Sequence, residues 1–123
     1  MKVVLLVDDA QEGRILTKWF LANFGFAVDC VSNAADALEL FDPRLHDAVI
    51  TDNSMPGMTG EELAHIIKLR SPSTPLIMYT GSAPKDRSCI DCVIQRPTHL
   101  MVLKEALDGL LAARDGAEGS GPA

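Results

Sequence analysis

Several polar residues stand directly after short apolar runs, at the points where β-strands would end. They are Asp8, Asp9, Asp52, Thr80 and Arg96. In a parallel sheet the carboxyl ends of all strands meet at one edge, and ligands bind outside that edge. We therefore expect these five side chains to converge on one cleft, although they come from distant parts of the chain.

The residue types in this set suggest a particular chemistry. Three carboxylates in one cleft repel one another, so the pKa of one would rise unless a cation neutralised them. Mg²⁺ suits such oxygen ligands and would bind Asp8, Asp9 and Asp52. Asp52 could then attack a phosphorus atom as a carboxylate nucleophile. Mg²⁺, Thr80 and Arg96 could each contact one phosphoryl oxygen, and Thr80 could swing toward the new group as a switch.

The elements that must hold these residues alternate along the chain. Apolar runs typical of strands lie at residues 3–7, 26–31, 48–51, 76–79 and 92–95. Helical patterns lie at residues 11–24, 34–41, 60–70 and 98–114. Ser32 or Asn33 would cap the second helix, and Thr59 and Glu62 form a capping box for the third. The alternation predicts an α/β fold with a five-stranded parallel sheet and helices on both faces.

The first and last helices each carry an apolar stripe that predicts the side packed against the sheet. The stripe of the first helix is Ile15, Leu16, Trp19, Phe20 and Phe24, with Gly25 as a left-handed cap. The stripe of the last helix is Leu100, Leu103, Leu107, Leu110 and Leu111. Met101 and Val102 widen the second stripe. Two alternatives stay open for them: burial in the core, or an exposed patch for a homodimer or another partner.

Composition sets broad limits. With 123 residues, 47% of them hydrophobic, the chain suits one domain with a substantial core. The net charge of -6 argues against a surface for nucleic acid or anionic membrane, and no apolar run is long enough for a membrane span. Three cysteines without a secretory signal predict reduced thiols and a cytoplasmic location. We expect a domain at residues 1–114, and a flexible tail or the start of a linker at residues 115–123.

The strand-end motifs together resemble one family. The chain is similar to the response-regulator receiver domain, the phosphoacceptor half of bacterial two-component signalling, over roughly residues 2–113. The motifs that carry the resemblance are Val7-Asp8-Asp9, Asp52-x-x-Met-Pro-Gly-Met-x-Gly, Thr80-Gly81 and the basic residue before Pro97. Because four motifs match in order and spacing, the combination is highly specific.

The resemblance implies a flavodoxin-like (βα)5 fold and a signalling domain rather than an enzyme, with effects only on its own phosphorylation and dephosphorylation. A histidine kinase or phosphotransfer protein would phosphorylate Asp52, and a downstream effector protein or domain would read the change. The backbone carbonyl of Ser54 would be a further Mg²⁺ ligand. The side chains of Ser54 and Ser82 would influence the lifetime of the phosphoryl group. The Arg96-Pro97 bond is a candidate cis peptide.

The sequence departs from the family pattern in three places. Arg96 stands where the family has Lys, and its forked guanidinium is bulkier. Val93 stands where a switch aromatic is expected. The span from Thr80 to Arg96 is several residues short, which predicts a fourth helix reduced to one turn or a loop. Because the departures lie toward the output face, we expect ordinary phosphoryl chemistry with altered signalling.

Other classes of function fit less well. A pseudo-receiver, which binds partners without phosphorylation, is the main alternative, and the intact acidic residues count against it. A phosphatase would need a second Asp two residues after Asp52, where Ser54 stands, and a flavin-mononucleotide carrier would not place Asp8 and Asp9 beside a phosphate. Cys89-x-x-Cys92 suggests a zinc site or a redox motif. One pair offers too few ligands for zinc, and a thioredoxin-like motif would start a helix after an early strand, whereas this pair precedes a strand. We therefore interpret the two cysteines as packing residues.

Overall fold

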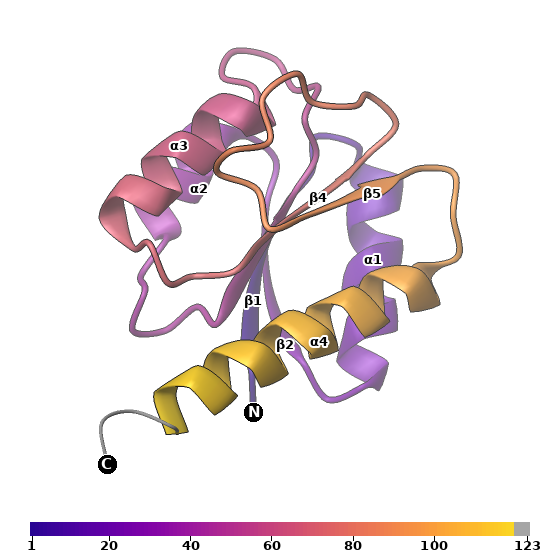
Figure 1. Ribbon diagram of the computed structural model, residues 1–123. Helices are drawn as coiled ribbons and strands as arrows, with labels where there is room; N and C mark the ends of the chain where they lie inside the picture. The colour runs from indigo at the N-terminus through magenta and orange to yellow at the C-terminus, as the bar shows by residue number, and fades with distance from the viewer. Residues whose placement is uncertain (120–123) are drawn as a thin grey trace.

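The structure, a computed structural model, describes residues 1–119, including the side chains of residues 1–116. The strands form one parallel sheet in the order β2-β1-β3-β4-β5 (Figure 1), which confirms the predicted α/β fold. The strand order reverses between β1 and β3, and ligands of such sheets bind at this point. The elements are β1 (Val3–Val7), α1 (Gln11–Asn23), β2 (Ala27–Val31), α2 (Ala34–Leu40), β3 (Ala48–Thr51), α3 (Gly60–Arg70), β4 (Leu76–Thr80), β5 (Cys92–Gln95) and α4 (Leu100–Gly119).

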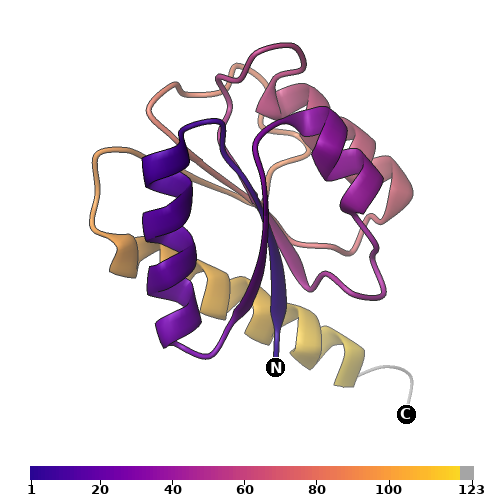
Figure 2. The same ribbon diagram turned by 180° about the vertical axis from the view of Figure 1, so that it is seen from behind.

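Two helical layers cover the sheet, with α1 and α4 on one face and α2 and α3 on the other (Figures 1 and 2). Every residue of β3 and β4 is buried, which explains why these strands are continuous apolar runs. Successive side chains of each strand enter opposite cores. The core under α1 and α4 includes Leu6, Ile50, Ile77, Leu103 and Leu107, and the core under α2 and α3 includes Leu5, Val49, Leu63, Ile67 and Leu76.

Helix α1 turns a different side to the sheet from the one that its apolar stripe predicts. Thr17 and Leu21 are its buried residues, and Phe20 is half-buried. The prediction is wrong for the other large residues of the stripe. Gly13 and Thr17 are small, so the helix approaches the site closely on this side and its bulky residues face outward. The outward residues are Ile15, Leu16, Trp19 and Phe24, with exposed fractions of 58%, 55%, 62% and 44%.

Local capping signals place the starts of α2 and α3 and the end of α1 close to where the sequence predicts them. Asn33 accepts a hydrogen bond from the backbone N–H of Asp36 at 2.8 Å and caps α2. Thr59 and Glu62 form the capping box of α3, which fixes the start of the helix after the loop that follows Asp52. Gly25 follows α1 with φ at 90°, a conformation that glycine adopts without strain.

The segment between β4 and β5, residues 81–91, is a loop without a helix, as the short span predicts. Two backbone N–H groups of this loop, those of Lys85 and Asp86, donate to Glu61 on α3. Pro84, which belongs to the same loop, is buried. The loop is therefore attached to α3 rather than forming a separate layer.

Helix α4 extends beyond the end near Arg114 that the sequence predicts. It continues to Gly119, and Asp115 forms an ion pair with Lys2 at 2.9 Å. A domain boundary at residue 114 stays a prediction, and residues 120–123 of the predicted tail lie outside the described residues. None of the helices in residues 1–119 combines the length and apolarity needed to cross a membrane.

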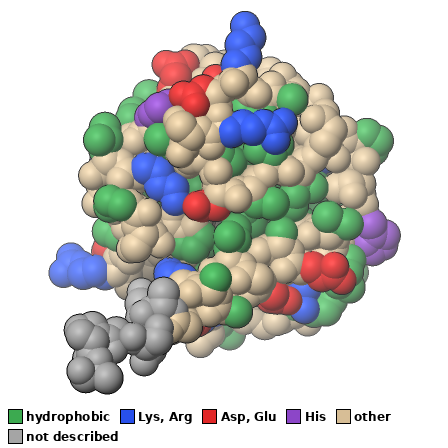
Figure 3. Space-filling model, viewed as in Figure 1, with side chains coloured by type: hydrophobic (Ala, Val, Ile, Leu, Met, Phe, Trp, Pro, Cys, Tyr) green, Lys and Arg blue, Asp and Glu red, His purple; other side chains and the backbone are tan. Residues whose placement is uncertain are grey.

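The predicted dimer patch, Met101 and Val102, lies on α4. Hydrophobic side chains gather on the face seen in Figure 3, which lies over α4 and the edge strand β5. Val102 is 44% exposed, whereas Met101 is half-buried. Neither side chain is fully buried, and the homodimer through this helix stays a prediction.

Candidate functional site

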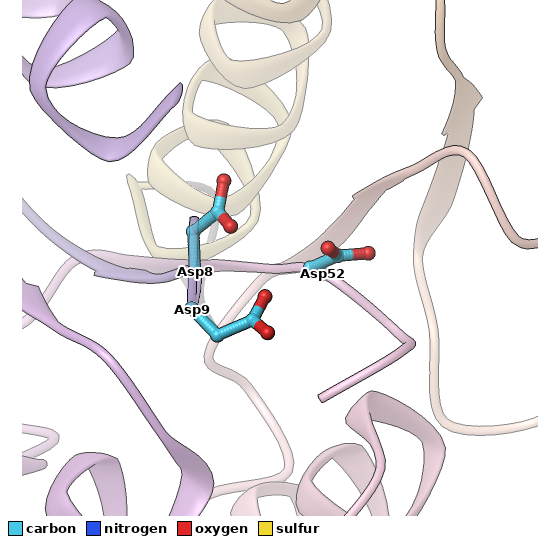
Figure 4. A group of neighbouring side chains, drawn as sticks. All are labelled: Asp8, Asp9 and Asp52. Atoms are coloured by element: carbon cyan, nitrogen blue, oxygen red, sulfur yellow. The ribbon is translucent and has the colours of Figure 1, made fainter. Parts of the chain in front are cut away.

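The three carboxylates at the strand ends lie together at the reversal point of the sheet. Asp8 and Asp9 follow β1 and Asp52 follows β3, and their side chains are turned toward a common space (Figure 4). One oxygen from each lies within 4.8 Å of the others. Within residues 1–116, this is the group of acidic, His or Cys side chains whose spacing suits a metal ion.

Asp8 is the buried member of this group. Its Oδ1 accepts a hydrogen bond from the Ala10 backbone N–H at 2.9 Å, and Arg14 Nη1 donates to its carbonyl oxygen at 2.7 Å. Burial raises the pKa of the Asp8 carboxyl, against the opposing effects of Ala10 and Arg96. A bound cation would favour the ionised form of such a group, so this donor set fits a divalent metal.

Asp52 is held by donors from three different segments. Thr80 Oγ1 donates to Asp52 Oδ1 at 2.6 Å, and the Asn53 backbone N–H donates to the same oxygen at 2.7 Å. Arg96 Nη2 donates to Asp52 Oδ2 at 3.2 Å. The structure therefore brings together all five residues that the sequence predicts at this edge, namely Asp8, Asp9, Asp52, Thr80 and Arg96.

Arg96 reaches Asp52 from the end of β5. Its guanidinium lies 4.8 Å from the centre of the Tyr79 ring, and its Nη1 lies 3.8 Å from Asp8 Oδ2. A Cβ at Gly13 would lie 3.3 Å from Asp8 Oδ2, which is a tight contact, and 3.6 Å from Arg96 Nη1, which is an ordinary one. The glycine therefore leaves room for the Asp8 carboxylate. The Arg96-Pro97 peptide bond is cis.

Sequence reasoning did not identify Tyr79, Gly13 or Asn53 as site residues. Tyr79 was visible only as the last apolar residue before Thr80, and Gly13 only as a gap in a helical pattern. Asn53 carries no strong signal by type, yet its side chain donates to the Ser82 carbonyl at 3.3 Å and accepts from the Glu61 N–H at 3.2 Å. These contacts become apparent only when β4, β5 and α3 are placed around Asp52.

Gly60 allows α3 to approach the backbone of Asp52 and Asn53 closely. Its N–H donates to the Asn53 carbonyl at 2.9 Å. A Cβ at this position would overlap the Asp52 carbonyl oxygen and would lie 2.9 Å from the Asn53 Cα. Only glycine fits this contact between the helix start and the backbone that follows β3.

An open cleft of about 640 Å³ lies beside the acceptor. Its lining includes Asp52, Ser54, Ser82 and Arg96, so the two predicted rate-modulating serines border the same space. Both serines are exposed. The metal contact of the Ser54 carbonyl and the influence of the serines on lifetime stay predictions. Val93 is half-buried on β5 opposite Met78, and its part in switching also stays a prediction.

Comparison with known proteins identifies the family. The family model described as "Response regulator receiver domain" matches residues 4–113, so the chain belongs to this family of two-component signalling domains. Its curated relatives include the autoinducer 1 sensor kinase/phosphatase LuxN of Vibrio harveyi, 29% identical over 113 residues that cover 88% of this chain and 13% of LuxN. The aerobic respiration control sensor protein ArcB of Escherichia coli is 28% identical over 123 residues, covering 94% of this chain and 16% of ArcB.

Solved structures show the same likeness. The response regulator TrrA of Thermotoga maritima, in complex with Mg²⁺–BeF, superposes with a TM-score of 0.84 at 30% identity, covering 89% of this chain and 99% of TrrA. A CheY-like receiver domain protein of Methanospirillum hungatei superposes with a TM-score of 0.88 at 25% identity, covering 94% of this chain and 98% of the Methanospirillum chain. The flavodoxin-like fold of the receiver domains is therefore shared. The chain spans only a small part of LuxN and ArcB, 13% and 16% of their lengths.

Proposed function

We propose that this receiver domain accepts a phosphoryl group on Asp52 from a histidine kinase or phosphotransfer protein, in a Mg²⁺-dependent reaction, and thereby changes its contacts with an effector. The single observation that carries the proposal is the set of contacts at the acceptor. Thr80 and Arg96, which are donors from two other strands, hold the two oxygens of Asp52 at 2.6 and 3.2 Å.

These contacts suit a carboxylate that attacks phosphorus. One Asp52 oxygen forms the new O–P bond while the P–N bond to the donor's imidazole breaks and that imidazole leaves with the bonding electron pair. The transferred group carries negative charge on three oxygens, so catalysis rests on positioning and on neutralising charge. Thr80 and Arg96 already lie beside the nucleophile. Each can therefore shift its hydrogen bond from Asp52 to a phosphoryl oxygen with a small movement.

Asp8, Asp9 and Asp52, with the Ser54 carbonyl, would hold the magnesium ion. Arg96 forms ion pairs with two of the three carboxylates, Asp8 and Asp52. The ion, when bound, would supply further positive charge to all three carboxylates and would neutralise a phosphoryl oxygen. Mg²⁺ is also part of the complex of the similar protein TrrA.

We infer that the protein carrying the phosphohistidine docks on α1. The exposed residues Ile15, Leu16 and Trp19 give this helix an apolar outer side. Leu16 also lines a groove of about 390 Å³ that shares Tyr79 and Arg96 with the acceptor cleft. A partner on this side would therefore reach the site directly. The similar TrrA has been crystallised with the histidine kinase ThkA.

The first test is intact mass after incubation with acetyl phosphate and Mg²⁺. We expect one added phosphoryl group, which is lost in Asp52→Asn and in a metal-free sample. Beryllofluoride provides a second readout, since it mimics an aspartyl phosphate without a chemical step. No adduct and no beryllofluoride binding would overturn the proposal and favour the pseudo-receiver, a binding module independent of phosphorylation.

The docking surface has a separate test. We expect Trp19→Ser to lower the rate of transfer from a phosphohistidine donor protein by about tenfold or more, because exposed apolar anchors dominate such interfaces. Labelling by acetyl phosphate should be unchanged, since Trp19 lies outside the acceptor contacts. Leu69→Ser on α3 is the matched control, because Leu69 is 84% exposed and lies on the other layer. Equal transfer by all three proteins would contradict docking on α1.

We also propose that the domain works in the cytoplasm. Cys30, Cys89 and Cys92 are all free thiols in the structure. Free thiols in a small domain suit a reducing compartment.

A further inference from the structure

A second cluster of reactive side chain types lies on the loop that replaces the fourth helix. Cys89 Sγ lies 3.2 Å from His65 Nδ1, and the other ring nitrogen of His65, Nε2, lies 3.0 Å from Asp86 Oδ2. Cys89 and Asp86 belong to the loop at residues 81–91, whereas His65 belongs to α3. The packing of the loop against α3 therefore places a nucleophile, a base and a carboxylate in a row. This order of groups is the one by which enzymes activate a thiol.

We propose that Cys89, His65 and Asp86 form a peroxide-reactive thiol site, in which His65 takes the thiol proton and Cys89 is oxidised to a sulfenic acid. The proposal is separate from phosphoryl transfer and does not rest on it, because none of its groups contacts Asp52. It also departs from the packing role that we predict for Cys89 from the sequence.

Asp86 determines which nitrogen of the His65 ring carries the proton. A carboxylate accepts hydrogen bonds, so the neutral ring carries its proton on Nε2 and turns the lone pair of Nδ1 toward the thiol. The backbone N–H and the hydroxyl of Ser88, followed by His65, hold the pKa of Asp86 below its ordinary value. The ionised carboxylate then stabilises the imidazolium that forms when His65 accepts the proton of Cys89.

The cluster is held in place by contacts on both elements. The Ser88 N–H donates to Asp86 Oδ1 at 2.9 Å, and the Ser88 hydroxyl lies 4.0 Å from Cys89 Sγ. Glu61, one turn before His65 on α3, accepts hydrogen bonds from the backbone of Lys85 and Asp86. The loop is therefore attached to α3 through Glu61 and His65, by way of the thiol itself and of residues that precede it.

Oxidation at this site balances with a peroxide as the oxidant. The Cys89 thiolate attacks one oxygen of hydrogen peroxide, so that an S–O bond forms and the O–O bond breaks. The leaving hydroxide takes the proton from the His65 imidazolium and departs as water. Sulfur loses two electrons and the peroxide gains them, which leaves a sulfenic acid and a neutral imidazole.

A metal ion fits the cluster less well than this reaction. Cys89 and Asp86 contact opposite nitrogens of the His65 ring, so one cation could not contact all three groups. The solvent can reach the site, since the side chains of His65 and Asp86 are 50% and 52% exposed. A small peroxide therefore has access to a thiol that is itself half-buried.

The other two cysteines serve as internal controls. Cys30 and Cys92 pack against the core under α1 and α4, whereas Cys89 packs against the core under α2 and α3. Burial raises the pKa of Cys30 and of Cys92, which makes both thiols poorer nucleophiles. Because Cys92 belongs to the opposite core, it is not placed to form a disulfide with an oxidised Cys89.

The test follows the oxidation of each cysteine by peptide mass spectrometry, with hydrogen peroxide as oxidant and dimedone to trap the sulfenic acid. We expect Cys89 to be trapped at least about tenfold faster than Cys92 or Cys30. His65→Gln should remove that advantage, and Asp86→Asn should reduce it by a smaller factor. The rate at Cys92 should be the same in all three proteins, which also shows that each variant is folded.

Two outcomes would overturn the proposal. The first is an equal rate at Cys89 and Cys92 in the unmodified protein. The second is a fast rate at Cys89 that His65→Gln leaves unchanged, because exposure alone would then explain the reactivity. Asp86→Asn changes an exposed loop residue only, so it keeps the test valid even if His65→Gln disturbs α3.

Discussion

Thr80 joins two regions of the molecule that are held in different ways. On one side lies the acceptor edge, where Asp8 and Thr80 are buried and the partners of Asp52 come from the ends of β4 and β5. On the other side lies the loop at residues 81–91, which is attached to α3 through the largely exposed side chains of His65 and Asp86 and through Glu61. The strands fix the first region, whereas hydrogen bonds to α3 and the packing of Cys89 and Ile90 against the core fix the second.

This difference teaches where such a domain tolerates change. At the acceptor edge, each side chain is placed by a strand that packs in the core, so a substitution there affects the chemistry and the fold together. Exposed ion pairs contribute little to stability, typically about 0–1 kcal/mol. Changes in the part of the loop that contacts α3 should therefore affect Asp52 less than changes at the strand ends do. The predictions below test this contrast.

The largest effect is expected at Gly60. Gly60→Ala would place a methyl group against the Asp52 carbonyl and the Asn53 Cα, so α3 must move away from the acceptor loop. We expect a loss of stability of about 3 kcal/mol and at least about a hundredfold slower labelling by acetyl phosphate. Chemical denaturation and intact mass measure the two effects.

Gly109→Ala is the matched control for this change. Gly109 lies on the exposed side of α4, where an added Cβ meets no atom within 4 Å. Alanine there should raise stability by about 0.5–1 kcal/mol and leave labelling unchanged. Equal behaviour of the two variants would contradict the close approach assigned to Gly60.

A smaller effect is expected at Arg96. Removing a charged hydrogen-bond donor costs about 1.5–3 kcal/mol, so Arg96→Ala should slow labelling by roughly 10–100-fold. Arg96→Lys keeps the charge and loses the contact with Tyr79. Its labelling rate should lie within about tenfold of that of the unmodified protein. If Lys proves as slow as Ala, the forked geometry of arginine matters more than its charge.

The loop should respond differently from the acceptor. Glu61→Ala removes the acceptor of the Lys85 and Asp86 N–H groups. We expect amide hydrogen exchange in residues 82–90 to speed up by about tenfold or more, while acetyl phosphate labelling changes by less than about threefold. A large change in labelling would show that the two regions are coupled through Glu61, and the contrast between them would fail.

The smallest expected effect concerns the outer surface of α4. If Met101 and Val102 support a homodimer, concentration-dependent light scattering should show a mass above that of the monomer, and Met101→Glu should remove it. A monomeric mass in both proteins would exclude this dimer. Because a helix face with one exposed valine offers little area, we expect only weak association.

Much of the fold follows from the sequence for physical reasons. The continuous apolar runs predict buried parallel strands, and the polar residues at their ends must meet at one edge. The capping box at Thr59 and Glu62 fixes the start of α3 at its first residue. The short span after Thr80 predicts the loop at residues 81–91. Each of these signals depends on neighbouring residues or on topology, and both can be read from the chain.

Other features depend on packing that the sequence does not specify. The apolar spacing of α1 shows which residues avoid water, but the inward side is chosen by where Gly13 and Thr17 allow close approach. The Tyr79–Arg96 contact joins two strands, and the Cys89–His65 contact joins a loop to a helix 24 residues earlier in the chain. Such contacts require the fold before they can be recognised.

The ion pair between Lys2 and Asp115 also matters for protein engineering. It brings the beginning of β1 and the last turns of α4 together, and Arg114 strengthens the junction through Asp47. Residues 2 and 115, near the two ends of the described chain, therefore lie close together in space. A short peptide joining residues 2 and 115, with new ends opened among residues 82–88, would give a circular permutant in which every strand pairing is kept. Its free ends would lie beside the acceptor edge, where a fused fluorophore could report phosphorylation.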